Sequence, residues 1–431
     1  MSEPTAPEPR DDAAHLLTAR EAAGRLGVKV ETLYAYVSRG MLDREVAMDG
    51  RTSLFAPGEV ERLAKRRRRG AASEGLEVVI DTGLTSIDDH RLRYRGLDAV
   101  DLVSTRSFEW VAEWLWTGHE GEQLEPWQPS VKSGELIAAE VAGMPSSATP
   151  GDRLRVAAAV AGATHSLRHD LRPRAVVRSA RRLIATMVDA LPLDAAATGE
   201  PMGLELPSGE VRPHAIAVRL WPRLGPAPAT AALVRTLNAA LVLLADHELA
   251  ASTLAARVAA STRADPYAVV GTGLGVLSGS LHGTASVPVH RLFSDVADAG
   301  VDHAGAVVAE HLRHSSFVPG FGHPLYPEGD PRAIALLDLV RSSDADPERL
   351  ATVDAVHAVM AEDAPADPNL DFGLAALAHV AGFHIGAGEA VFAVARSAGW
   401  IAHAIEEYGE PGNRFRARAR YVGSRARRGA S

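Results

Sequence analysis

The sequence predicts an all-α protein, in which a large helical body follows a small basic domain. Three observations support this class. Alanine, the strongest helix former, is abundant. Apolar residues recur at helical spacing in segments separated by proline and glycine. Strand-like alternation is scarce after about residue 90. The 431 residues are enough for two or three domains.

Composition excludes several classes of protein and site. The chain has no cysteine, which excludes disulfides, thiolate metal sites and a cysteine nucleophile. No apolar run reaches the roughly 20 residues that span a bilayer. Residues 1–14 are acidic and proline-rich, which predicts a disordered tail rather than a signal peptide, and a cytoplasmic protein. We find no H-E-x-x-H or equivalent spacing and expect no metal site.

Charge is distributed unevenly along the chain. The net charge is −9, yet residues 15–70 hold twelve basic and seven acidic residues, and residues 71–431 hold 32 basic and 43 acidic ones. A basic head on an acidic body suggests that the two parts have separate tasks.

The head, residues 15–70, has the element order of a winged helix-turn-helix domain. We expect a helix from the N-cap Thr18 to Arg25, a turn at Gly27 and a second helix that ends at Gly40. An Asp-Gly turn, a short strand and a helix beginning at Pro57 or Gly58 follow.

This order of elements resembles the MerR and excisionase-like families, which bind DNA. The resemblance implies that second-helix residues face the major groove: Lys29, Thr32, Tyr34 and Arg39. The alternative is a small docking module whose basic end, residues 65–69, is simply solvated.

The body begins after a linker at residues 71–75. Alternation in residues 78–88 predicts a small hairpin, and Ser107 and Gly118 bound a helix with an apolar face. Residues 154–167 and 229–249 read as core helices.

Four stretches of the body carry polar side chains in apolar surroundings. They are residues 245–262 with His247, 277–286 with His282, 320–332 with His323 and Arg332, and 368–377 with Asp371. Arg396 and the arginines of residues 416–420 follow. Each alone has a structural explanation: a hydrogen-bonded histidine, a turn, an N-cap aspartate or an internal ion pair.

Together these side chains predict carbon–carbon chemistry on a polycarboxylate. Arginines bind carboxylates through paired hydrogen bonds. A carboxylate can remove a carbon-bound proton when a donor stabilises the resulting enol. Neutral imidazoles can supply that donor and polarise a second carbonyl.

Several motifs occur in the order and spacing of the citrate synthase family. They are "DHELAAST", "LHGTAS", "GFGH" followed by "DPR", "NLDF", "ARSAGWIAH" and "RARARYVG". The resemblance covers residues 76–424 and leaves a basic tail at 425–431. It implies a large helical domain, a small domain at about residues 285–385 that closes over substrate, and a homodimer.

The resemblance also implies a role for each matching residue. Asp371 resembles the base that deprotonates acetyl-CoA, His282 the enol-stabilising donor, and His323 the residue that polarises the oxaloacetate ketone. The implied oxaloacetate ligands are His247, Arg332, Arg396 and Arg416, the last reaching the partner subunit's site. The implied CoA-binding main chain is Pro319, Gly320, Phe321 and Gly322. No tightly bound cofactor is implied, because acetyl-CoA is a co-substrate.

The sequence departs from the family pattern beside these positions. Ala250 replaces a common asparagine, and Pro324 and Pro327 stand where basic side chains are common. The changes therefore bear on acyl-CoA affinity more than on the reaction. We expect citrate synthase-type condensation, a step of the tricarboxylic acid cycle. The alternatives are 2-methylcitrate synthesis from propionyl-CoA, cleavage of citryl-CoA, a DNA-binding metabolite sensor, and a helical scaffold.

Overall fold

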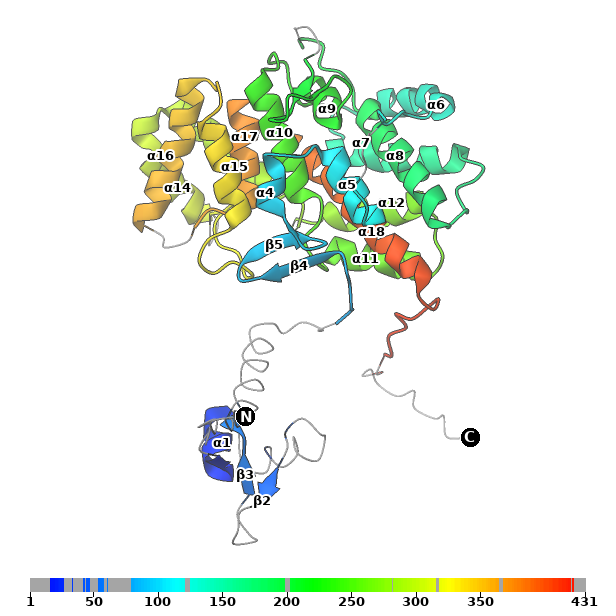
Figure 1. The fold of residues 1–431 in the computed structure, drawn as a ribbon. Coiled ribbons are helices and arrows are strands. Elements are labelled where there is room, and N and C mark those ends of the chain that lie inside the picture. Colours follow the sequence, from blue (N-terminus) through cyan, green and yellow to red (C-terminus); the bar gives the residue numbers. More distant parts are fainter. Residues whose placement is uncertain are drawn as a thin grey trace, which may run out of the picture. The chain divides into compact units, whose positions relative to one another are not determined.

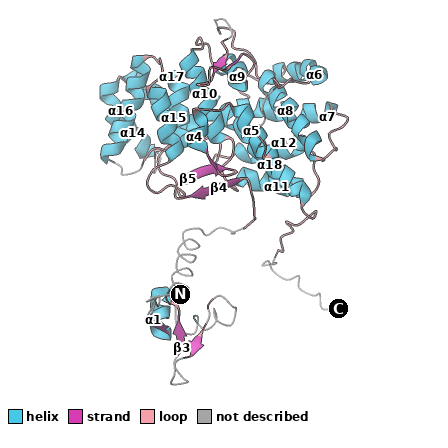
Figure 2. Ribbon diagram, viewed as in Figure 1, coloured by secondary structure: helices cyan, strands magenta, loops and turns pink. Residues whose placement is uncertain are grey.

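The chain divides into two compact units, residues 1–81 and 82–431, which we describe separately. The computed structural model describes residues 16–26, 33, 42, 44–46, 53–57, 60, 79–120, 125–197, 202–280, 282–314, 318–363, 367–419 and 421. Figures 1 and 2 show the elements along the chain and their types.

The first unit contains one clear helix and a small antiparallel sheet. Helix α1, Ala19–Leu26, begins after Thr18, whose hydroxyl accepts from Glu21 N while Glu21 accepts from Thr18 N. The predicted cap and helix are therefore confirmed. Strands β1 (Leu17–Thr18), β3 (Ser53–Phe55) and β2 (Glu45–Val46) pair in that order. Apolar side chains such as Leu26, Leu33 and Phe55 form its core.

The second unit opens with a three-stranded antiparallel sheet. Strands β4 (Thr85–Asp88), β5 (Arg91–Tyr94) and β6 (Leu97–Asp98) follow one another. Asp89 and His90 both adopt positive φ, the turn geometry that matches the twist of a two-residue hairpin. The hairpin expected at residues 78–88 thus lies further along the chain, because the strands begin only at Thr85.

Most helices of the second unit form one group around α18, Ala387–Gly409. The group comprises α4 (Ala99–Val103), α5 (Phe108–Thr117), α6 (Val131–Ala142), α7 (Pro150–Thr164), α8 (Pro173–Ala190), α9 (Ile216–Leu224), α10 (Ala231–Leu244), α11 (Ala251–Ser261) and α12 (Pro266–Leu277). A short hairpin, β7 (Leu204–Glu205) and β8 (Val211–Arg212), adjoins them. Ser107 and Gly118 cap α5 as predicted.

The remaining helices pack mainly on one another at one end of this unit (Figure 1). They are α13 (Ser286–Ala299), the 3₁₀ helix η1 (Val301–His303), α14 (Ala304–His314), α15 (Pro331–Arg341), α16 (Pro347–Asp363) and α17 (Leu370–Val380). Helices α15 and α17 also contact α10 of the first group.

Helix α18 is the centre of the hydrophobic core. Almost its whole length is buried, and it packs on α5, α8, α11 and α12. The approach to α12 is close: a Cβ built on Gly273 would lie 2.5 Å from the Trp400 ring. The class prediction holds, because the described chain is mostly helical with three small sheets.

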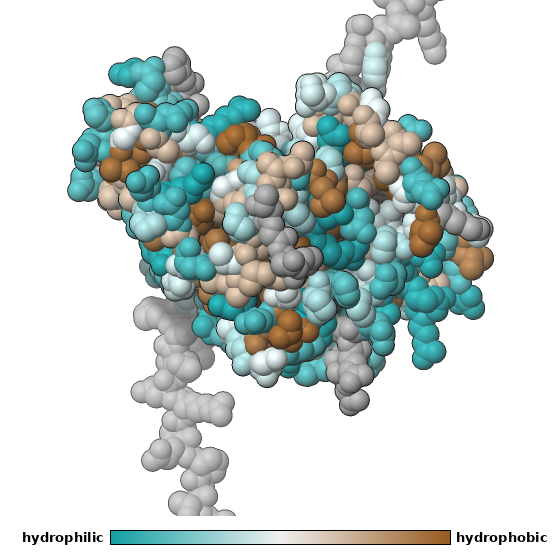
Figure 3. Space-filling model, turned by 90° about the horizontal axis from the view of Figure 1, so that it is seen from above, coloured by the Kyte–Doolittle hydropathy of each residue, from teal (hydrophilic) through white to brown (hydrophobic). Residues whose placement is uncertain are grey.

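The outer surface of the second unit carries both hydrophilic and hydrophobic side chains. On the face shown in Figure 3, small hydrophobic groups are scattered between hydrophilic ones. Among the described helices, none is both long and apolar enough to cross a membrane.

Candidate active site

The loop at residues 318–330 and the start of α17 are joined by backbone hydrogen bonds. Asn369 N donates to Gly320 O at 2.8 Å, and Gly322 N donates to Asp367 O at 2.8 Å. Asn369 Nδ2 also donates to Gly322 O at 3.0 Å. The loop that carries His323 is therefore fixed to the helix that carries Asp371.

Gly320 is required at its position in this loop. Its φ is +91°, and an added Cβ would meet Val289 at 2.9 Å and Phe372 at 3.1 Å. Phe321 stacks edge-to-face on Phe372, with ring centroids 4.9 Å apart. The four predicted CoA-contacting residues, 319–322, thus form the strand-like link beside α17.

Asp371 lies in the first turn of α17. The N-cap of this helix is Asn369, whose side chain accepts from Asp371 N at 3.0 Å. The alternative that Asp371 is merely the cap is therefore wrong, and among the described residues no hydrogen bond engages its carboxylate. Burial raises the pKa of Asp371 to about 6, with Asp330 adding to the shift and Arg332 and Arg396 opposing it.

His247 follows the end of α10. Tyr94 of β5 holds this end, because its hydroxyl lies 3.0 Å from Val242 O. Glu248 then adopts a left-handed φ of 51°, a conformation that is costly for a residue with a side chain. Burial, together with Arg332 and Arg396, lowers the pKa of His247 well below its usual range, so the imidazole is neutral.

His323 lies beside His247, with ring centroids 5.3 Å apart. Leu325 N donates to His323 Nδ1 at 3.1 Å, so a neutral ring carries its proton on Nε2. Burial and Arg332 lower the pKa of His323, while Asp330 opposes them. His323 is therefore arranged as a neutral hydrogen-bond donor.

His282 is fixed by two residues that the sequence analysis did not select. Ser252 Oγ lies 2.7 Å from His282 Nε2 and accepts from Trp400 Nε1 at 3.2 Å. This arrangement lets the serine hydroxyl donate to Nε2, which leaves the proton of a neutral ring on Nδ1. Burial and Arg396 lower the pKa of His282 to about 4.

Two buried arginines lie at the same site. Arg332 places Nε and Nη2 on the Asp330 carboxylate, at 2.9 and 2.7 Å. Its Nη1 and the second N–H of Nη2 are left for a ligand. Arg396 donates Nε to Leu244 O at 2.7 Å and lies over the Phe392 ring, 4.7 Å from its centroid. Phe392 in turn contacts the His282 ring.

A buried polar chain supports the site from behind. Arg257 Nη1 donates to His403 Nδ1 at 2.8 Å, so His403 Nε2 carries a proton toward Asp246 Oδ2 at 3.3 Å. Thr85 also donates to this oxygen at 2.5 Å. Burial would raise the pKa of Asp246, but His403 and Arg396 outweigh it and lower the pKa. The sequence analysis missed this chain, whose only signal was Asp246 next to His247.

Six of the seven predicted acid–base and oxaloacetate residues thus lie in one linked cluster: His247, His282, His323, Arg332, Asp371 and Arg396. Arg416 does not join it. Arg416 is exposed on the segment after α18, and among the described residues we find no contact between it and the cluster. The predicted DNA-contacting residues lie outside the described part of the chain: Lys29, Thr32, Tyr34 and Arg39.

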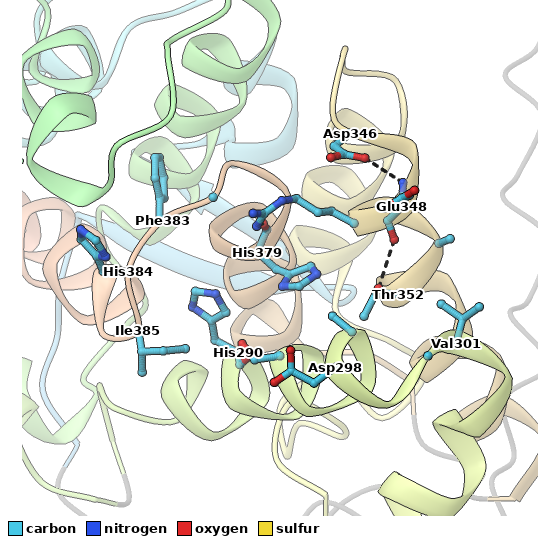
Figure 4. A pocket seen from close by; sticks show the side chains of 16 residues that line it. His290, Asp298, Val301, Asp346, Glu348, Thr352, His379, Phe383, His384 and Ile385 are labelled. Carbon is cyan, nitrogen blue, oxygen red and sulfur yellow. Dashed lines mark hydrogen bonds between the residues drawn. The ribbon is translucent and has the colours of Figure 1, made fainter. Parts of the chain in front are cut away.

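Two cavities among the described residues lie away from this cluster. The larger, about 780 Å³, is lined by α13, α16 and the connection after α17, and includes His290, Arg349 and His379 (Figure 4). The second, about 520 Å³, lies around His165 and Tyr267. Neither contains a predicted site residue.

The cluster contains the parts for removing a proton next to a carbonyl group. A carboxylate with a raised pKa is a stronger base than usual. Neutral imidazoles can donate hydrogen bonds to oxygens that gain negative charge. Buried guanidinium groups can bind a carboxylated ligand beside them.

Comparison with known proteins agrees with this chemistry. The family described as "Citrate synthase, C-terminal domain" matches residues 75–418. The citrate synthase of Haloferax volcanii is 33% identical over 83% of this chain and 97% of its own length. Citrate synthase 2 of Bacillus subtilis is 30% identical over 82% of this chain and 96% of its own length. 2-Methylcitrate synthase 2 of Corynebacterium glutamicum is 29% identical over 74% of this chain and 86% of its own length.

Solved structures show the same fold. Citrate synthase from Thermoplasma acidophilum, in a ternary complex with carboxymethyl coenzyme A and oxaloacetate, superposes with a TM-score of 0.65 at 22% identity. The match covers 84% of this chain and 98% of that chain. Citrate synthase from Thermotoga maritima superposes with a TM-score of 0.63 at 24% identity, covering 80% of this chain and 94% of that chain. From the family match and the curated relatives, we conclude that this chain belongs to the citrate synthase family.

Proposed function

We propose that the second unit condenses acetyl-CoA with oxaloacetate and water to give citrate and CoA. The observation that carries this proposal is the position of Asp371, a base with a raised pKa, in one cluster with neutral histidines and two buried arginines. Family membership supports the same reaction.

In the first step, the Asp371 carboxylate takes a proton from the methyl group of acetyl-CoA. The electron pair moves to the thioester oxygen, and His282 stabilises the resulting enolate by donating a hydrogen bond to this oxygen. The cost of breaking this weakly acidic C–H bond falls because the donor and the base are both held in place before the reaction.

In the second step, the enolate carbon attacks the ketone carbon of oxaloacetate. His323, with its proton on Nε2, polarises the ketone and donates a hydrogen bond to the alkoxide oxygen that forms. Water then cleaves the thioester of citryl-CoA and releases citrate and CoA.

His247, Arg332 and Arg396 would bind the oxaloacetate dianion. Arg396 has its terminal nitrogens available after Nε is used, and Arg332 has Nη1 and the second N–H of Nη2. We further propose a homodimer in which Arg416 completes the partner subunit's site, since the described chain shows it exposed and apart from its own cluster.

We propose that α13–α17 act as the small closing domain, at about residues 285–385. Their mutual packing at one end of the unit supports this. The main chain at residues 319–322, beside Asp371, would contact CoA. We place the reaction in the cytoplasm, as a step of the tricarboxylic acid cycle.

Propionyl-CoA is a second candidate acyl donor, because 2-methylcitrate synthases are among the similar proteins.

For the first unit we keep DNA binding as a proposal. A regulatory DNA-binding role for the whole chain, with the body as a metabolite sensor, is the alternative to catalysis.

Thiol release from acetyl-CoA and oxaloacetate tests the enzymatic proposal, and propionyl-CoA in the same assay tests the acyl group. We expect thiol release that requires both substrates. If the protein releases thiol neither from acetyl-CoA nor from propionyl-CoA, the proposal of catalysis is contradicted. Salt-dependent binding of a genomic fragment pool by the full chain, lost when residues 1–70 are removed, would support the DNA-binding proposal.

A further inference from the structure

Tyr326 lies in the loop at residues 318–330, and the proposed reaction gives its side chain no task. Only 2% of it is exposed, whereas its neighbour Leu325 is 42% exposed. A loop residue buried to this degree must find partners in the interior of the protein.

The partners of Tyr326 are three of the proposed oxaloacetate-binding or polarising residues. Its hydroxyl lies 3.0 Å from His247 Nε2. The Arg332 guanidinium lies over its ring, 5.1 Å from the centroid. The His323 ring lies 4.9 Å away, centroid to centroid. These partners come from the end of α10, the first turn of α15 and the loop itself.

The contact with His247 joins two neutral groups. Burial raises the pKa of Tyr326 to about 12, and the His247 imidazole is also neutral. One of the two donates and the other accepts, and the hydrogen bond restrains the orientation of the His247 ring.

We propose that Tyr326 is a positioning residue for the oxaloacetate half of the site, aligning His247 through its hydroxyl and Arg332 through its ring. The inference rests on the proposed function. It assigns Tyr326 to oxaloacetate rather than to the acyl-CoA, because among the described residues its contacts include neither Asp371 nor His282.

Two substitutions separate the hydroxyl from the ring. Tyr326→Phe keeps the ring over Arg332 and removes the hydrogen bond to His247, whereas Tyr326→Leu removes both. Tyr408→Phe is the matched control. Tyr408 lies near the C-terminal end of α18, and its largely buried hydroxyl donates to Ala264 O at 2.6 Å.

Oxaloacetate binding to the full-length proteins is measured by calorimetry without acyl-CoA, and KM is measured for both substrates. We expect Tyr326→Phe to weaken oxaloacetate binding roughly three- to tenfold, with KM for acyl-CoA unchanged. Tyr326→Leu should weaken it further, and Tyr408→Phe should leave both substrates unaffected.

Unchanged oxaloacetate binding in Tyr326→Phe, or equal losses for both substrates, would overturn the proposal. The two proposals fail separately: wild-type protein that binds oxaloacetate and forms no product contradicts the proposed function, while the binding data still test Tyr326. Wild-type protein that does not bind oxaloacetate contradicts both.

Discussion

At the residue scale, the proposed reaction needs a deprotonated carboxylate and neutral imidazoles in one cluster. Burial raises the pKa of Asp371 to about 6, so its carboxylate is available as the proposed base near neutral pH. His282 has a pKa of about 4, so it stays neutral while Asp371 titrates. We therefore expect activity to fall below about pH 6 as Asp371 takes up a proton.

Asp371→Asn separates the proposed catalytic task of this carboxylate from its effect on stability. We expect thiol release to fall by at least about 100-fold, because the base is lost. A raised carboxyl pKa stabilises the folded state below pH 4, and this stabilisation is lost as the pH rises through about 6. At pH 8 the variant should therefore be more stable than the wild type, by up to about 3 kcal/mol in unfolding free energy. Its unfolding temperature should be correspondingly higher.

Thermal unfolding of both proteins at pH 5 and pH 8 measures this effect. The advantage of the variant should be smaller at pH 5, where the wild-type carboxyl is largely protonated in the folded protein. An equal advantage at both pH values would contradict the raised pKa.

At the element scale, α18 connects the core to the site. Arg396 lies at the site, Trp400 holds Ser252, and His403 holds Asp246, and these residues recur about one helical turn apart. Gly399 lets the helix approach the end of α10, since an added Cβ would lie 2.5 Å from Ala245 O and closer still to Asp246 Oδ1.

Gly399→Ala should therefore displace Asp246 and, with it, His247. We expect about 1–3 kcal/mol lower unfolding free energy, measured by denaturant titration, and weaker oxaloacetate binding. Gly409→Ala is the control on the same helix, because its added Cβ meets no atom within 4 Å. If both variants behave alike, close packing at Gly399 is not what orders the site.

At the scale of the whole molecule, Arg416 distinguishes a site within one chain from a site shared between chains. The segment that carries it is anchored next to the core, because Arg414 donates to both Glu407 oxygens at 2.7 and 2.6 Å. Arg416 itself is exposed two residues later. Because the segment is anchored at Arg414 and Arg416 is exposed, Arg416 is free to extend toward the site of a second copy of the chain.

Mixing two inactive variants tests this arrangement. Arg416→Ala and Asp371→Asn should each be nearly inactive alone. In a shared-site dimer, a mixed dimer regains one intact site, so refolding the two at equal amounts should restore about a quarter of wild-type activity. No recovery, with mixed dimers verified by mass spectrometry, would show that Arg416 serves its own chain or no site.

The sequence by itself determined the helical class, the caps of α1 and α5, and the polar residues of the site. These follow from local rules: Thr18, Ser107 and Gly118 act through their own backbone neighbours, and apolar periodicity marks helices before they pack. The tertiary structure decided what depends on distant partners. It gave the Asp371 carboxylate its raised pKa, because burial there comes from separate elements, and assigned the cap to Asn369. It also brought Ser252 to His282, Tyr326 to His247 and His403 to Asp246, contacts that span up to 157 positions and leave no pattern in the sequence.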